Sequence, residues 1–141
     1  MIIMEITRDT IYISFHLYNF EYFGNKLPAP NFKVKHSYRT LGFFSCEYDE
    51  DGYMFNQTIE ISDSYDYTES QLRDILVHEM IHYYLAYMGI DPQCSHGTEF
   101  KRMANDFNRK YGMNITSTID LTPYEIKKGN SKLIFTLSTL F

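Results

Sequence analysis

The clearest hydrophobic pattern lies between Thr68 and Met88, where apolar residues recur three and four positions apart. This spacing places them on one face of a helix. Thr68 and Gln71 form a capping box at its start, and Gly89 follows its end as a left-handed cap would. The expected core-facing positions are Val77, Met80, Ile81, Tyr84, Leu85 and Met88.

Two other stretches have the same helical spacing. Residues 6–26 form the first, which we expect to end near Gly24, before the Pro28–Pro30 breaker. Thr98 to Tyr111 forms the second, which ends at Gly112. The expected apolar positions are Ile11, Phe15, Tyr18 and Tyr22 in the first, widened by Leu17 and Phe20, and Phe100, Met103, Ala104, Phe107 and Tyr111 in the second.

Three strand candidates separate the first two helices. Phe32 to His36 alternates apolar and basic residues, Leu41 to Tyr48 is rich in aromatic residues, and Tyr53 to Ile61 follows a turn. That turn, residues 49–52, ends in an Asp-Gly step that is typical of hairpins. Because no helix separates these strands, we expect an antiparallel sheet and an α+β fold.

Composition indicates one well-packed domain. The 141 residues are 44% hydrophobic and 17% aromatic, which is enough for a single core and argues against disorder. No apolar run has the length of a membrane span, and Met1 to Glu5 lacks the features of a signal peptide. Cys46 and Cys94 do not form a C-x-x-C pair, so we expect a reduced, cytoplasmic protein.

The charge gives no support for non-specific nucleic-acid binding, because the net charge is −5 and such binding depends on neutralising phosphates. Acidic residues gather in the middle of the chain, and basic residues gather on either side of it. We interpret these clusters as solvated faces. The basic residues are Lys26, Lys33, Lys35 and Arg39 before the acidic region and Lys101, Arg102, Arg109 and Lys110 after it.

The chemistry of the chain centres on the sequence His78-Glu79-Met80-Ile81-His82. On a helix, residues four apart share a face, so His78 and His82 present two imidazoles side by side. This is the H-E-x-x-H arrangement, in which two histidines bind zinc and the glutamate acts as general base. A catalytic zinc site needs a third protein ligand. His96 is the best candidate, with the Cys94 thiolate as the alternative.

These residues resemble the SprT-like metalloprotease domain, a family that includes bacterial SprT proteins and the Spartan and Wss-type proteases. The resemblance rests on the motif at 78–82, on His96-Gly97-Thr98-Glu99-Phe100 after it, and on Phe23 to Pro28 before the strands. It covers residues 6–112 and leaves 113–141 as a C-terminal extension. The chain lacks the Cys-rich zinc segment, the tail motifs and the basic charge of the better-studied members.

The resemblance implies a zincin-like, minigluzincin-type single domain over residues 1–141 with one Zn²⁺ per chain, held by His78, His82 and His96. It implies a zinc-dependent endopeptidase acting on unfolded or DNA-associated proteins, with DNA as a partner by resemblance only. Glu79 would be the general base. It also places the strand Leu41 to Cys46 at the sheet edge beside the metal, where an extended substrate can add by backbone pairing.

Some roles stay open at the level of sequence. Asp74 and Glu99 are candidates to orient the ligand histidines, and Tyr83, Tyr111 and Tyr124 are candidates to stabilise an oxyanion. His16 and His36 are expected not to bind metal. The apolar run from Leu133 to Phe141 is expected to pack on the domain.

Two rival functions also remain. The first is a non-catalytic module in which a metal ties two helices together and the surface binds protein or nucleic acid. Glu79 counts against it, because a structural metal site does not need an acid–base group. The second is a hydrolase of non-peptide amides.

Overall fold

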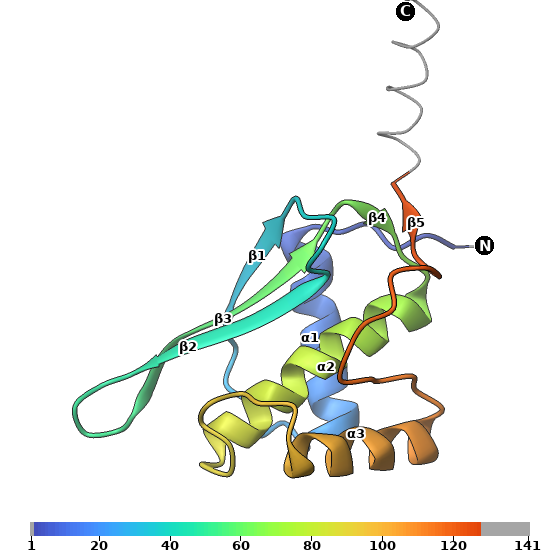
Figure 1. Cartoon of the computed structure of the whole chain (residues 1–141). Coiled ribbons are helices and arrows are strands. Elements are labelled where there is room, and N and C mark those ends of the chain that lie inside the picture. Colours follow the sequence, from blue (N-terminus) through green and yellow to red (C-terminus); the bar gives the residue numbers. More distant parts are fainter. Residues whose placement is uncertain (1, 128–141) are drawn as a thin grey trace, which may run out of the picture.

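The computed structural model describes residues 2–127 and has the α+β composition expected from the sequence. Figure 1 shows α2 at the centre, with the sheet on one side and α3 crossing near its C-terminal half. The elements are α1 (Arg8–Tyr22), β1 (Asn31–Lys35), β2 (Gly42–Tyr48), β3 (Met54–Ser62), β4 (Tyr65–Asp66), α2 (Glu69–Tyr87), α3 (Thr98–Tyr111) and β5 (Glu125–Ile126).

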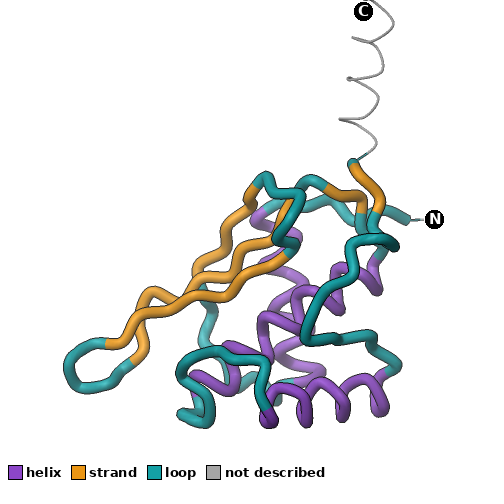
Figure 2. Tube along the Cα trace, in the orientation of Figure 1, coloured by secondary structure: helices purple, strands orange, loops and turns teal. Residues whose placement is uncertain are grey.

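The three-stranded sheet is mixed, so the expectation of an antiparallel sheet was wrong for one of its two pairings. The strand order is β1-β3-β2, with β1 parallel to β3 and β2 antiparallel to β3. Two parallel strands need a long connection between them. Here β2 and the turn after it form the connection between β1 and β3 in place of a helix. Strand β2 therefore lies on the side of β3 that is opposite to β1. As a result β2 forms an edge of the sheet, and the β2–β3 hairpin projects from the body (Figure 2).

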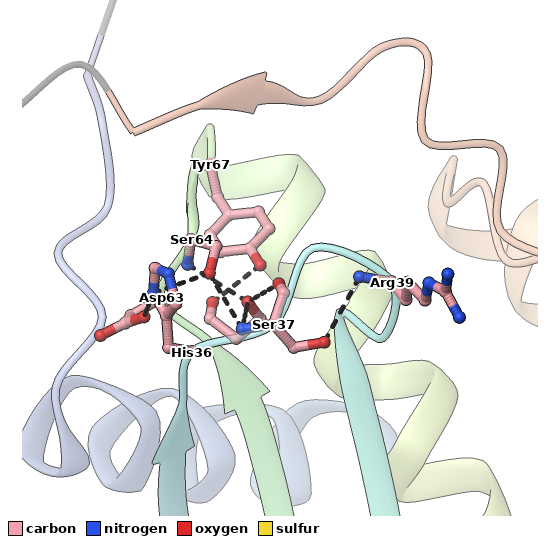
Figure 3. Close-up of polar contacts among 7 residues, drawn as sticks. His36, Ser37, Arg39, Asp63, Ser64 and Tyr67 are labelled. Carbon is pink, nitrogen blue, oxygen red and sulfur yellow. Dashed lines mark hydrogen bonds and ion pairs between the residues drawn. The ribbon is translucent and has the colours of Figure 1, made fainter. Parts of the chain in front are cut away.

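A polar cluster fixes the turn that carries the chain from β1 to β2 (Figure 3). The Ser37 backbone N–H donates to Ser64 Oγ at 2.9 Å, and the Ser62 hydroxyl donates to the Ser37 carbonyl. The Tyr67 hydroxyl donates to the Ser62 carbonyl at 2.8 Å. Because Thr68 caps α2 immediately after Tyr67, the cluster sets the start of β2 and the start of α2 relative to each other.

Helix α2 is buried on nearly all sides. Thr68 and Gln71 form the expected capping box, and Gly89 has a left-handed φ of 72° beyond the helix end. The buried face is wider than the predicted one because the sheet, α1 and α3 all pack on this helix. Of the predicted positions, Tyr84 is half-buried and Met88 is exposed.

Helix α1 has a narrower buried face than the sequence pattern predicts. Ile11, Phe15 and Tyr18 are buried, but Leu17 and Phe20 are exposed, so the predicted widening was wrong. The helix packs against β1 and α2, and Tyr22 at its end packs against Phe107 and Tyr111 of α3. These contacts leave the side of α1 that carries Leu17 and Phe20 exposed.

The residues after α3 also join the core. Met113 and Ile115 are buried in the same hydrophobic cluster as the helices and the sheet, and β5 pairs with β4. Part of the 113–141 extension therefore packs on the body, whereas the run from Leu133 to Phe141 lies outside the described residues. None of the described helices has both the length and the hydrophobicity to cross a lipid bilayer.

Candidate metal centre

Two histidines of the centre come from neighbouring turns of α2. His78 and His82 are 6% and 5% exposed, and their ring centroids lie 5.0 Å apart. Packing around the whole of α2 holds both side chains on a rigid element, as a metal site requires.

The third histidine reaches them from the loop before α3. His96 Nε2 lies 3.2 Å from His78 Nε2 and 3.1 Å from His82 Nε2. Phe100, in the first turn of α3, packs its ring against all three imidazoles, with centroids 4.5 to 4.9 Å away. The packing of α3 against α2 thus places His96 beside His78 and His82.

The geometry of the three nitrogens fits a metal ion. Ligands at 2.0–2.1 Å from a tetrahedral Zn²⁺ lie about 3.3 Å from each other. The Nε2 separations here are close to that value, and no other group of potential ligand side chains in residues 2–127 converges in this way. The cluster can therefore hold a metal ion.

Burial keeps two of the imidazoles neutral. Burial, together with the neighbouring histidines, lowers the pKa of His78 to about 3 and that of His82 to about 4. A neutral imidazole has the free lone pair that a metal needs, so both side chains are ready to ligate at physiological pH.

Glu79 lies beside the cluster without belonging to it. Its side chain is buried, and its Oε2 lies 3.9 Å from His78 Nε2. Burial raises its pKa to about 8, while a hydrogen bond from the Phe44 backbone of β2 acts in the opposite direction. A cation bound next to this carboxyl would lower its pKa and favour the carboxylate.

Gly42 of β2 leaves room for this carboxyl, a role that the sequence analysis missed. A Cβ at position 42 would lie 2.9 Å from Ile75 Cγ2 and 3.1 Å from Glu79 Cγ. The strand can therefore approach α2 closely enough for Phe44 to reach Glu79 only if residue 42 is glycine. A glycine inside a strand pattern is a known signal of such close approach.

The cluster opens into a cavity of about 760 Å³. One wall is the edge strand β2 with the residues before it, and another is the loop from Pro92 to His96. Ser117 to Ile119 contribute to the lining, and Glu79 and all three histidines face the cavity.

The two carboxylates proposed to orient the histidines have other partners in this structure. Asp74 accepts from Arg73 and from the Asn114 backbone N–H at 3.3 Å. Glu99 is half exposed and accepts from Arg102. Among the described residues, the outer partner of His78 is a backbone group: the imidazole ring is hydrogen-bonded to the backbone of Thr116.

The three tyrosines proposed as oxyanion donors do not line the cavity. The Tyr83 hydroxyl donates to the Pro28 carbonyl at 2.7 Å, and its ring stacks on Phe44. Tyr111 packs against Tyr22, and Tyr124 packs against Tyr65 and Tyr67. Tyr48, which the sequence analysis did not single out, lines the cavity and donates to the Pro92 carbonyl at 3.2 Å.

Cys94 lines the cavity but is not part of the converging cluster. Burial raises the pKa of its thiol to about 11, so it is protonated at neutral pH, and a protonated thiol is a poor ligand. Both Cys94 and Cys46 are free thiols. The arrangement thus favours His96 over Cys94 as the third ligand.

His36 lies outside the metal cluster and takes part in the polar cluster of Figure 3. Its Nδ1 lies 3.2 Å from Asp63 Oδ1 and 3.0 Å from Ser64 Oγ. A serine–histidine–aspartate relay needs the serine and the aspartate on different ring nitrogens. Since both groups share Nδ1 and Ser64 is fully buried, these residues hold the turn and do not form a nucleophilic site. His16 is exposed on α1, where it packs against Tyr12.

The metal-free protein is expected to be most stable between about pH 6 and 7. Below the ordinary histidine pKa of 6.5, the unfolded chain protonates His78 and His82 while the folded protein does not, so acid lowers stability. Above it, the folded protein keeps a proton on Glu79 up to about pH 8, whereas the unfolded chain lost that proton near 4.5, so alkali also lowers stability. A difference of one proton changes the free energy of unfolding by about 1.4 kcal/mol per pH unit.

Denaturant unfolding of chelator-treated protein across this pH range measures the effect. Glu79→Gln should flatten the alkaline side and steepen the acid side between about pH 4.5 and 6.5, where the proton on folded Glu79 offsets one of the two histidine protons. A wild-type stability that rises steadily from acid to alkaline pH would contradict the assignment.

Comparison with known proteins identifies the family of the chain. No curated protein sequence gives a significant match to the chain. The model of the SprT-like family matches residues 11–119, which include most of α1, the three-stranded sheet, all three histidines and the first part of the segment after α3. This match covers more than half of the sequence and extends past Gly112, where the resemblance in the sequence motifs ends. The chain belongs to the SprT-like family.

Proposed function

We propose that this protein is a zinc-dependent endopeptidase with a zincin-like active site. The observation that carries the proposal is the convergence of three imidazole nitrogens, 3.1 and 3.2 Å apart, at a cavity that also contains a buried carboxylate. Membership of the SprT-like family is consistent with it. His78, His82 and His96 would hold one Zn²⁺, which supplies a Lewis acid and lowers the pKa of a bound water to about 7.

Residues of the chain supply the general base and the surroundings of the metal. Glu79 accepts a proton from the attacking water and later delivers it to the leaving amine. The Phe44 backbone, which is hydrogen-bonded to Glu79, aims this carboxylate into the cavity. The low exposure of Glu79, His78 and His82 excludes bulk water from the side of the site that faces the core.

Incubation with a denatured protein tests the activity. We expect cleavage by the zinc-loaded protein, loss of cleavage in a chelator and recovery when zinc is returned. The same incubation is repeated in the presence of DNA, because the family resemblance suggests DNA as a partner while the net charge of −5 does not favour it. Zinc binding with no cleavage of any substrate, with or without DNA, would favour a non-catalytic metal module instead.

The substrate is expected to add to the free edge of β2 by backbone pairing. The Ser62 N–H donates to the Leu41 carbonyl at 2.8 Å, so alternate residues of β2 turn their backbone groups towards β3. The backbone groups of Gly42 and Phe44 therefore point towards the open edge, next to Glu79. The Phe44 N–H is hydrogen-bonded to Glu79, so the Gly42 N–H and the carbonyls of both residues are the groups left for a substrate. Pairing of this kind reads the backbone, so the sequence specificity should be loose.

Peptides with single N-methyl groups test this pairing. Methylation at alternate amides beside the cleaved bond should slow cleavage by about tenfold, the cost of one lost hydrogen bond with its partner left unpaired. Methylation at the amides between them should have little effect. Equal cleavage of the whole methylated series would contradict backbone pairing.

A further inference from the structure

The segment that follows α3 folds back over α2 (Figure 1). A second cavity of about 440 Å³ adjoins the cavity of the metal centre at this segment. His78, Thr118 and Ile119 line both cavities. His78 therefore faces the three-histidine cluster on one side and the segment after α3 on the other.

The contact between this segment and His78 is a hydrogen bond with the Thr116 backbone, which raises the pKa of the imidazole against the effect of burial. A backbone group that raises a histidine pKa is a carbonyl that accepts from the ring. Because Nε2 faces His96, the donor is the Nδ1–H. This bond selects the tautomer in which Nε2 has a free lone pair and also fixes the plane of the ring.

Two side chains hold the residues just before Thr116. The Asn108 amide of α3 donates to the Ile115 carbonyl at 2.9 Å and accepts from the Ile115 N–H at 2.8 Å. Asp74 of α2 accepts from the Asn114 N–H at 3.3 Å. Arg73 links these anchors, because it donates both to Asp74 and to the Gly112 carbonyl.

We propose that Asp74 and Asn108 are positioning residues of the metal centre, which hold residues 114–116 so that the Thr116 carbonyl orients His78. Neither side chain has a hydrogen bond to a histidine among the described residues, so both act through the backbone of this segment. The proposal rests on the proposed metal centre, but it does not depend on peptidase activity.

Zinc affinity, measured by competition with a chromophoric chelator, tests the proposal. Asp74→Ala and Asn108→Ala should each weaken zinc binding by about 10- to 100-fold, the usual effect of removing an outer partner of a ligand histidine. Asp106→Ala is the matched control, because Asp106 is a half-exposed carboxylate of α3 that pairs with Arg109. Its zinc affinity should equal that of the wild type.

Two further measurements separate positioning from general stabilisation. Asp74→Asn keeps an oxygen that can accept from Asn114, so it should recover most of the zinc affinity lost in Asp74→Ala. NMR of the metal-free protein should show His78 with its proton on Nδ1 in the wild type and a mixture of tautomers in the two alanine variants. Both are recorded well below the thermal midpoint of each variant.

The outcomes are distinct. Alanine variants that bind zinc as tightly as the control, or that keep the His78 tautomer, would overturn the positioning role even if their thermal midpoints fall. Failure of the wild-type protein to bind zinc would overturn the metal centre and this proposal together. Zinc binding without peptidase activity would leave the positioning role standing and count against the proposed function.

Discussion

Glu79→Gln is expected to reduce peptidase activity by about 10²–10⁴, the usual contribution of a positioned general base. Glutamine keeps the size of the side chain and an oxygen that can accept from the Phe44 backbone, as Glu79 does. It cannot accept a proton from water. Since Glu79 lies 3.9 Å from His78 Nε2 and outside the converging cluster, zinc should stay bound and the fold should stay intact.

Three measurements on the same preparations check this expectation: zinc content, thermal midpoint and the rate at which a denatured protein is cleaved. Glu99→Gln is the control, because Glu99 is a half-exposed glutamate three residues after His96 that pairs with Arg102. It should keep nearly full activity. Equal rates for wild type and Glu79→Gln would remove Glu79 from the role of general base.

His96→Ala should abolish tight zinc binding. Loss of an outer hydrogen-bond partner of a ligand histidine weakens metal binding by about 10- to 100-fold. Loss of one of the three ligands themselves should weaken zinc binding by more than that. His96 is the most informative of the three, because it is exposed on a loop whereas His78 and His82 are buried in the core. Its removal should change the metal-free fold little, so a loss of zinc reports on the metal site itself.

Cys94→Ser accompanies this variant, because Cys94 was the alternative third ligand and lines the same cavity. Its zinc content should match that of the wild type. Full zinc occupancy in His96→Ala, or loss of zinc in Cys94→Ser, would show that the third ligand has been assigned wrongly.

The sequence predicted the central helix and the cluster on it because both depend on local spacing. Thr68 and Gln71 are close enough in the chain to specify the helix start, and a separation of four residues places His78 and His82 together on any helix. His96 was found through the family motif, since nothing in the spacing of a loop determines where it returns. The structure then brings its Nε2 to the other two.

The topology of the sheet could not be predicted in the same way. The order β1-β3-β2 depends on the polar contacts of Ser37, Ser62 and Ser64, which join positions about 25 residues apart. No periodic pattern marks such contacts. A rule based on the absence of a crossover helix therefore gave the wrong direction for β1 relative to β3.

The residues around the ligands differ in how far the sequence pattern could predict their roles. Gly42 could have been noticed, because a glycine inside a strand pattern indicates close backbone approach. Asp74 was proposed to orient a ligand histidine, but its hydrogen-bond partners are Arg73 and the Asn114 backbone. Asn108 and Thr116 gave no signal, since their role depends on how the chain returns after α3.

Zinc reconstitution of the chelator-treated protein is the most direct test of a zinc peptidase with three histidine ligands. Small aliquots of zinc are added, and bound metal and cleavage of a denatured protein are measured in parallel. We predict that cleavage rises in proportion to bound zinc and reaches a plateau at one ion per chain, and that the triple variant of His78, His82 and His96 to alanine shows neither signal. Cleavage that persists without metal, or zinc binding and cleavage that survive in the triple variant, would contradict the account.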